Sequence, residues 1–337
     1  MTAAALAAGA LVLTGCGGSG SGGGDGSLKV GLAFDVGGLG DKSFNDAAYK
    51  GLEKAKKELG AEVQTITPTE QVNRQDLLRQ LGDEGYNLII GVGFLYQEDV
   101  QAVAKEFPDA TFACVDCNAS GANIVNLTFA EEQGSFMVGA AAALTSKTKH
   151  VGFVGGDKGP LIEKFEAGFV QGAKAVDPSV KVDSTYIAPE GANGVGFKSP
   201  DKAKIIAQGF YRGGADVVYH ASGQSGGGVF EAAKEGAVGG KKWAIGVDSD
   251  QALADPNYAD LILTSMVKRV DVAVYDFIKS VEDSKKPASR QVYDLKVDGV
   301  SYATTGNHLD GIKAKLEEFK AKIIAGDIKV ADKPSAS

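Results

Sequence analysis

The sequence predicts an α/β protein made of two lobes, each built on a doubly wound parallel sheet. From residue 28 onward, short β-rich runs alternate with helical patterns of apolar residues. The strand runs are apolar throughout, as expected when helices cover both faces of a parallel sheet. The number of these units, roughly ten, exceeds what one small open sheet holds. A polar break at 146–149, followed by a new strand, a glycine-rich turn and a helix, favours a second lobe over a (β/α)₈ barrel.

The composition narrows the possible functions. The chain has 337 residues, a length typical of about two domains. Asp and Glu (43) outnumber Lys and Arg (35), which gives a net charge of -8 and argues against a nucleic-acid partner. Because the chain has only 3 His and 3 Cys, little room is left for a multi-metal site. We expect neither a bound metal nor a cofactor.

The N-terminus has the features of an exported, lipid-anchored protein. Residues 3–13 are apolar or glycine, too few to span a bilayer but enough for the core of a signal peptide. The run ends in LTGC at 13–16, which resembles the lipobox of bacterial lipoproteins. We therefore expect a signal peptide at 1–15, then a lipidated Cys16 and a flexible Gly/Ser tether at 16–27. The expected location is the extracytoplasmic face of the cell membrane.

Strands and helices then follow one another along the folded part. In the first half we expect strands at 28–34, 62–66, 88–92, 111–115 and 124–127, and helices at 44–59, 74–84, 98–107 and 132–144. In the second half we expect strands at 151–154, 182–187, 217–220, 243–247 and 262–266, and helices at 161–176, 200–211, 228–235, 270–281 and 312–324. The first lobe is expected to comprise 28–144 plus 258–286, the second 145–257 plus 287–330, and 331–337 a disordered tail.

Polar residues stand where several of these strands end. Asp35 follows the first strand and Asp116 the fourth, while Asp248 and Lys268 follow two strands of the second half. In open α/β sheets, ligands bind beyond the carboxyl ends of the strands. Carboxylates accept hydrogen bonds from pairs of hydroxyls, and aromatic rings offer flat apolar faces. The residues at these strand ends predict a binding cleft rather than an enzyme active site.

Cys114 and Cys117 form a Cys-x-x-Cys pair around Asp116. A redox pair, half of a zinc site and a local disulfide all fit this spacing. Zinc is disfavoured, because the chain has no second Cys pair and its histidines lie far apart in sequence. We favour a disulfide, which requires a turn after Val115 because successive strand residues point to opposite faces.

Several short segments together resemble the basic membrane protein family, the purine-nucleoside-binding lipoproteins of nucleoside ABC importers. They are 35–38 (DVGG), 41–45 (DKSFN), 129–132 (FAEE), 165–172 (FEAGFVQG), 221–230 (ASGQSGGGVF), 246–251 (GVDSDQ) and 264–271 (TSMVKRVD). The resemblance covers residues 28–325 and keeps the family's motif order. It implies a type I periplasmic-binding-protein fold, with two Rossmann-like lobes, three crossover strands and a cleft that closes about a hinge.

The resemblance also implies a ligand, a partner and a set of contact residues. The ligand is a purine nucleoside (adenosine, guanosine or inosine), the partner is an ABC transporter permease, and the protein is expected to act as a monomer. Two rings would enclose the base, two polar side chains would bond its edge, and the remaining residues would hold the ribose. In that order, the residues are Phe44 and Phe197; Asp35 and Asn45; Asp116, Asp248, Lys268 and the backbone of Gly223.

Several of these residues have a purely structural alternative. Phe44 could be the first core residue of its helix, Asp248 a turn residue and Lys268 a solvated surface charge. Asp41 and Ser43 both suit the N-cap of the helix at 44–59, and we expect that structural role for Ser43. At the level of function, a sugar-binding or signalling receptor of the same fold stays open, and so does a nucleoside hydrolase, which would need a clustered acid and base.

Overall fold

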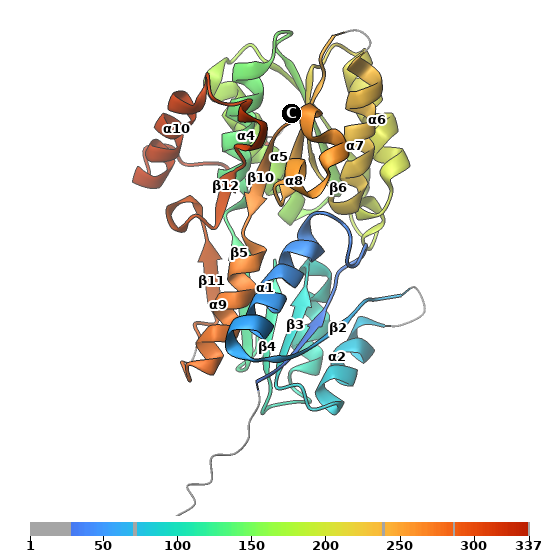
Figure 1. The fold of residues 1–337 in the computed structure, drawn as a ribbon, viewed down its shortest axis with the longest axis vertical. Coiled ribbons are helices and arrows are strands. Elements are labelled where there is room, and N and C mark those ends of the chain that lie inside the picture. The colour runs from blue at the N-terminus through green and yellow to red at the C-terminus, as the bar shows by residue number, and fades with distance from the viewer. Residues whose placement is uncertain (1–27, 70–72, 238–239, 286, 336–337) are drawn as a thin grey trace, which may run out of the picture.

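The computed structural model describes residues 28–69, 73–237, 240–285 and 287–335 and arranges them as two lobes along the long axis of the molecule (Figure 1). Each lobe contains a six-stranded sheet, so the predicted two-lobed α/β architecture is confirmed. The predicted signal peptide, the lipidated Cys16 and the Gly/Ser tether lie outside the described residues.

Lobe 1 is built on a parallel sheet with the strand order β11-β5-β4-β3-β1-β2. Its strands are β1 (Lys29–Ala33), β2 (Glu62–Ile66), β3 (Leu88–Val92), β4 (Thr111–Val115), β5 (Ile124–Phe129) and β11 (Arg290–Tyr293). Its helices are α1 (Phe44–Leu59), α2 (Arg74–Asp83), α3 (Gln97–Val103) and α9 (Val270–Glu282), and α9 packs against α1.

Lobe 2 is built on the sheet β12-β10-β9-β8-β6-β7, in which only β12 runs antiparallel to its neighbour. Its strands are β6 (His150–Asp157), β7 (Lys181–Ala188), β8 (Val217–Ala221), β9 (Trp243–Asp248), β10 (Ile262–Lys268) and β12 (Val300–Tyr302). Its helices are α4 (Glu131–Thr145), α5 (Pro160–Val176), α6 (Pro200–Arg212), α7 (Gly226–Gly236), α8 (Gln251–Ala254) and α10 (Lys313–Ala325).

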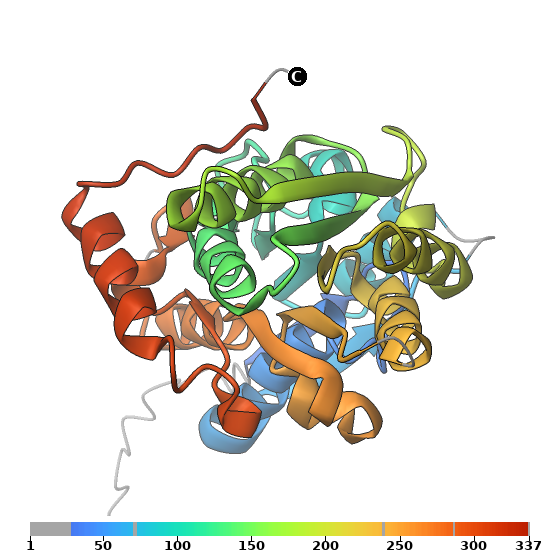
Figure 2. The same ribbon diagram turned by 90° about the horizontal axis from the view of Figure 1, so that it is seen from above.

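The core of lobe 2 shows why its strands are apolar on both faces. The helix pairs α4–α5 and α6–α7 cover opposite sides of the sheet (Figure 2). Successive residues of a strand point to opposite faces. Accordingly, Phe153 of β6 belongs to the hydrophobic cluster that includes α4 and α5, whereas the next residue, Val154, belongs to the cluster that includes α6 and α7. Both side chains are fully buried, as predicted for strands covered on two sides.

Helices α4 and α5 pack with their backbones in close contact. A Cβ atom at Gly168 would collide with the backbone carbonyl of Glu132, and one at Gly172 with that of Phe136. These two glycines of the segment 165–172 therefore serve helix packing.

The chain crosses between the lobes three times: after β5, after β10, and between β11 and β12. The expected lobe boundaries differ from this arrangement. The expected first lobe includes 131–144, but these residues form most of α4, which packs against α5 in lobe 2. It also includes 258–286, in which α9 does lie in lobe 1 but β10 pairs with β9 in the sheet of lobe 2. The expected second lobe includes 287–330, but β11 pairs with β5 in the sheet of lobe 1. The partner of β11 is far away in sequence, since Arg290 lies opposite Asn126, and local patterns do not reveal such a pairing.

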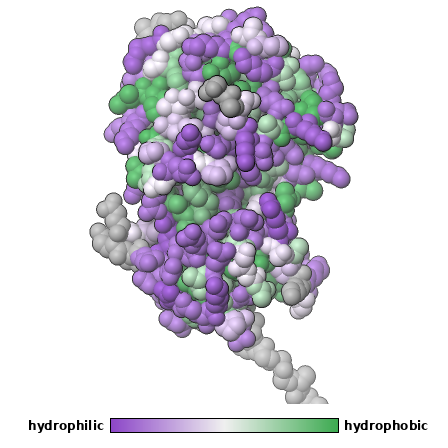
Figure 3. Space-filling model, turned by 180° about the vertical axis from the view of Figure 1, so that it is seen from behind, coloured by the Kyte–Doolittle hydropathy of each residue, from purple (hydrophilic) through white to green (hydrophobic). Residues whose placement is uncertain are grey.

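On the face shown in Figure 3, the surface is largely hydrophilic and carries small hydrophobic patches. None of the helices in the described ranges has both the length and the apolar character that a membrane crossing requires. After α10, the chain runs back over lobe 2, where the backbone N–H of Ala331 donates to Gln171 of α5 at 2.7 Å (Figure 2).

Candidate functional site

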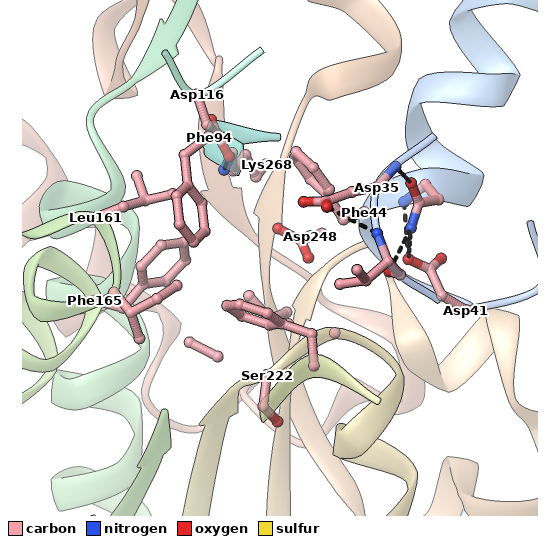
Figure 4. A pocket seen from close by; sticks show the side chains of 17 residues that line it. Asp35, Asp41, Phe44, Phe94, Asp116, Leu161, Phe165, Ser222, Asp248 and Lys268 are labelled. Atoms are coloured by element: carbon pink, nitrogen blue, oxygen red, sulfur yellow. Dashed lines mark hydrogen bonds and ion pairs between the residues drawn. The ribbon is translucent and has the colours of Figure 1, made fainter. Parts of the chain in front are cut away.

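A cavity lies between the two lobes, at the carboxyl ends of their strands, and residues of both lobes line it. Figure 4 shows Phe94, Leu161 and Phe165 on one side of the cavity and Asp35 and Phe44 on the other. All eight residues that the sequence predicted as ligand contacts line this cavity: Asp35, Phe44, Asn45, Asp116, Phe197, Gly223, Asp248 and Lys268.

Asp41 organises the lobe 1 wall by capping α1. Its carboxylate accepts hydrogen bonds from the backbone N–H groups of Ser43 and Asn45, both at 2.9 Å, at the start of the helix. The Asn45 side chain donates to Asp41 at 3.0 Å and accepts from the backbone N–H of Asp35 at 2.9 Å. Its amide therefore holds Asp35 and Asp41 together within lobe 1, a structural task that the sequence did not suggest. Burial raises the pKa of Asp35 to about 7 and that of Asp41 to about 6.

Lys268 is a buried charge at the centre of the site. Only 2% of its surface is exposed, so the alternative of a solvated surface charge is wrong. Its ammonium pairs with Asp116 and lies 3.6 Å from Glu131. The rings of Phe44 and Phe165 lie 4.9 and 5.5 Å from it, a cation–π arrangement. Burial lowers the pKa of Lys268, but the nearby carboxylates outweigh it and raise the pKa above its ordinary value.

Asp116 and Asp248 occupy matching places in the two lobes, directly after β4 and at the end of β9. Both have left-handed backbone conformations, with φ of 63° in each case, which is rare for a residue other than glycine. Burial raises the pKa of Asp116 to about 7 despite the opposing charge of Lys268. One Asp116 carboxylate oxygen, Oδ1, is buried without a hydrogen-bond partner in the protein. A buried acceptor of this kind is suited to a donor supplied by a ligand.

The turn beyond β4 carries a disulfide between Cys114 and Cys117, whose Cα atoms are 5.5 Å apart. The favoured interpretation of the Cys-x-x-Cys pair thus agrees with the structure. The chain turns at Asp116, directly after Val115, as the bridge requires. The disulfide closes the short loop that bears Asp116 and so restricts the backbone of a cavity-lining residue.

The aromatic lining is richer than the sequence predicted. Phe197, in a short 3₁₀ turn (Val195–Phe197), lies edge-on to Phe94 with ring centroids 6.1 Å apart. Phe94, which directly follows β3 and Gly93, and Phe165 of α5 were not predicted as contacts although both line the cavity. Position at a strand end was the available signal for Phe94. Phe44 lines the cavity and also packs against the main core, so its two interpretations are compatible.

The raised pKa of Asp35 predicts a pH dependence of stability. A carboxyl whose folded-state pKa is raised stabilises the protein at low pH and loses that effect as the pH rises through about 7. Between pH 8 and pH 6, we expect Asp35 alone to raise the free energy of unfolding of the ligand-free protein by about 1.4 kcal/mol. Chemical denaturation at the two pH values measures this difference, and Asp35→Asn should reduce it.

Asp177→Asn is the matched control for this prediction. Hydrogen bonds from Lys149 and Ser179 lower the pKa of Asp177, so its carboxyl stays ionised at pH 6 and at pH 8. The difference in the free energy of unfolding between pH 6 and pH 8 should therefore be unchanged in Asp177→Asn. An Asp35→Asn variant that keeps the full wild-type difference would contradict the assignment.

Residues 28–333 match the family described as "ABC transporter substrate-binding protein PnrA-like". The chain is 34% identical to the ABC transporter nucleoside-binding protein BmpA of Lactococcus lactis, covering 96% of this chain and 95% of that protein. It is 35% identical to an uncharacterized lipoprotein of Pyrococcus abyssi, covering 92% of this chain and 76% of that protein. Among solved structures, it is similar to an ABC transporter solute-binding protein of Aeropyrum pernix K1, with 29% identity, a TM-score of 0.79, and 92% and 94% of the two chains covered.

Proposed function

The chain belongs to the PnrA-like family of ABC transporter substrate-binding proteins, and we propose that it captures purine nucleosides for an importer of this class. This family consists of binding proteins rather than enzymes, and the resemblance noted in the sequence is confirmed at family level. The proposed ligands are adenosine, guanosine and inosine, and the proposed partner of the loaded protein is a permease.

The cavity between the lobes carries the proposal. It combines flat aromatic faces with buried carboxylates and an ammonium, the groups that a nucleobase and a ribose each need. Phe44 and Phe197 would stack on the base, and Asp35 would accept hydrogen bonds from its edge. Asp116 would accept a ribose hydroxyl at its unpartnered oxygen. The name of the Lactococcus lactis relative, a nucleoside-binding protein, supports this choice of ligand.

Hinge closure is the proposed mechanism of capture. Asp35 and Asp116 belong to lobe 1, whereas Phe197 and Asp248 belong to lobe 2. A ligand that contacts both lobes at once binds the closed arrangement more tightly, and so it shifts the population toward closure. The closed protein would then dock on the permease as a monomer, through the outer surfaces of both lobes.

Lipid anchoring at the extracytoplasmic face is also part of the proposal. It rests on the lipobox-like LTGC at 13–16, which would make Cys16 the lipidated residue, and on the Gly/Ser tether that follows. The Pyrococcus abyssi relative is named as a lipoprotein, which supports this reading. Mass spectrometry of the membrane fraction should find a diacylglycerol-modified Cys16, and Cys16→Ser should release the protein from the membrane.

Calorimetric titration tests the proposed ligand. The protein is unfolded and refolded to remove carried ligand, then titrated with adenosine, guanosine, inosine, cytidine and ribose. We expect tight purine binding without product formation. Ribose binding alone would favour the sugar-receptor alternative, release of a free base would favour a hydrolase, and no binding to any of the five would refute the purine proposal.

Phe44→Ala should weaken purine nucleoside binding about 5- to 150-fold, because one base–ring stack contributes roughly 1–3 kcal/mol. The matched control is Phe210→Ala on α6, which removes a half-buried ring that does not line the cavity. The affinity of the Phe210→Ala variant for purine nucleosides should stay close to that of the wild type. Equal affinities for the two variants would mean that Phe44 acts only in the core.

A further inference from the structure

Ser43 occupies the N-cap position of α1, but its side chain makes no capping hydrogen bond. The structural role expected for Ser43 is therefore wrong, because Asp41 supplies the carboxylate that caps this helix. The Ser43 hydroxyl instead crosses to lobe 2 and donates to Asp248 Oδ2 at 2.6 Å. Ser43 is fully buried, so this hydrogen bond is shielded from water.

Three further contacts join the same two segments. Ser249 Oγ donates to the Ser43 carbonyl at 3.1 Å, and Gln251 Nε2 donates to the Lys42 carbonyl at 3.1 Å. The Lys42 ammonium lies 2.9 Å from Asp255 Oδ2. We call this set the interlobe clasp: Lys42 and Ser43 of lobe 1 with Asp248, Ser249, Gln251 and Asp255 of lobe 2. Every contact in it joins one lobe to the other, so it depends on how the lobes are placed.

The backbone at both ends of the clasp is held in an unfavourable conformation. Lys42 has φ of 56° and Asp248 has φ of 63°, both in the left-handed region. Such conformations are unfavourable for residues with a side chain, and they persist where surrounding contacts impose them. Lys42 contributes its carbonyl and its ammonium to the clasp, and Asp248 contributes its carboxylate.

The lobe 2 half of the clasp is continuous with the cavity wall. Gln251 Oε1 accepts from the backbone N–H of Val247 at 2.9 Å and lies 2.9 Å from His220 Nε2. His220 Nδ1 lies 3.3 Å from the hydroxyl of Ser222, which lines the cavity. Burial lowers the pKa of His220 to about 4, so its ring is uncharged at neutral pH. The ring therefore links Gln251 of the clasp to Ser222 of the cavity wall by hydrogen bonds alone.

We propose that Ser43 is a positioning residue, which fixes the Asp248 carboxylate toward the ligand and couples that contact to closure of the lobes. The inference rests on the proposed function, because it assumes that Asp248 holds the ligand. With the lobes apart, Asp248 loses the Ser43 hydroxyl and is free to rotate. With the lobes together, one carboxylate oxygen is held by Ser43, which leaves the carboxylate oriented in the cavity wall. The ligand and the clasp then reinforce each other.

The test compares Ser43→Ala with Ser43→Thr, which keeps the hydroxyl. Inosine affinity is measured by calorimetry and dissociation by stopped flow. We expect Ser43→Ala to weaken binding about 10-fold, mainly through faster dissociation, and Ser43→Thr to restore much of the loss. In an Asp248→Asn background, Ser43→Ala should change the affinity less than about threefold, because coupled residues are not additive. The proposal would be overturned if Ser43→Ala bound inosine as tightly as the wild type. It would also be overturned if the effects of Ser43→Ala and Asp248→Asn on the binding free energy were additive.

A distance measurement separates this proposal from the choice of ligand. Spin labels are placed at Lys57→Cys on α1 and Arg212→Cys at the end of α6, both exposed and in different lobes. In the ligand-free protein, Ser43→Ala should shift the distance distribution away from the closed arrangement relative to Ser43→Thr. If the wild type binds no nucleoside, the proposal of a nucleoside ligand is wrong. The distance measurement in the ligand-free protein then still tests whether the Ser43 contact favours closure of the lobes. An unchanged distribution would overturn the coupling to closure.

Discussion

Lys268→Met is expected to lower the free energy of unfolding by about 3–5 kcal/mol at pH 8, the cost of removing one partner from a buried ion pair. Methionine keeps the length and apolar packing of the lysine stem against Phe44 and Phe165. It leaves Asp116, whose side chain is 4% exposed, without its cation. Denaturant titration of the ligand-free protein measures the loss.

The loss should be smaller at pH 5 than at pH 8. In the variant, ionised Asp116 has no counter-charge, so protonation of its carboxyl at low pH relieves the buried charge. Lys164→Met is the matched control, since Lys164 also pairs with Glu131 but its side chain is 28% exposed. We expect a loss of about 1 kcal/mol or less for this control. Equal losses for the two lysines would refute a special role for the buried one.

Asp248→Asn is expected to weaken purine nucleoside binding at least about 100-fold while leaving the fold intact. The amide has nearly the same shape as the carboxylate but accepts hydrogen bonds with one oxygen only and carries no charge. Each hydrogen bond to a charged group contributes about 1.5–3 kcal/mol, and the ribose would lose one such hydrogen bond together with the charge that strengthens the other. Because burial raises the pKa of Asp248, loss of its charge should cost little stability. Calorimetry and thermal unfolding measure the two effects separately.

Asp250→Asn is the matched control for this substitution. Asp250 lies two residues further along the chain and accepts a hydrogen bond from Thr305 at 2.6 Å, but it does not line the cavity. The affinity of the Asp250→Asn variant for nucleosides should stay within about threefold of the wild-type affinity. If both variants bind as the wild type does, Asp248 is only a turn residue, the alternative that the sequence left open.

Much of the fold follows from local patterns in the sequence. The continuous apolar runs of β3 and β4 predicted buried parallel strands, and their predicted bounds, 88–92 and 111–115, coincide with the structure. The apolar stripe of α1 predicted its full range, 44–59. The two shortest strands, β11 and β12, were not predicted from these patterns. β11 has four residues and β12 three, with partly exposed side chains, so neither forms an apolar run.

Position at the strand ends predicted the cavity lining well, because parallel strands bring their carboxyl ends to one edge of a sheet. Asp35, Asp116 and Asp248 were found in this way, and family resemblance added Phe197 and Gly223. Phe165 was missed as a cavity residue because it lies within a helix, α5, and not at the end of a strand. Its position in the helical pattern is the same as that of an ordinary core residue.

Local patterns in the sequence were enough to predict the two-lobed α/β architecture, the family and eight residues that line the cleft. The interactions among those residues became visible only in the folded chain. Lys268 and Asp116 are 152 residues apart, and Ser43 and Asp248 are 205 apart. Burial patterns record which face of a strand or helix avoids water, a short-range property. Charge pairing, the capping by Asp41 in place of Ser43, and the exchange of strands between lobes depend on distant partners, which meet only when the chain is folded.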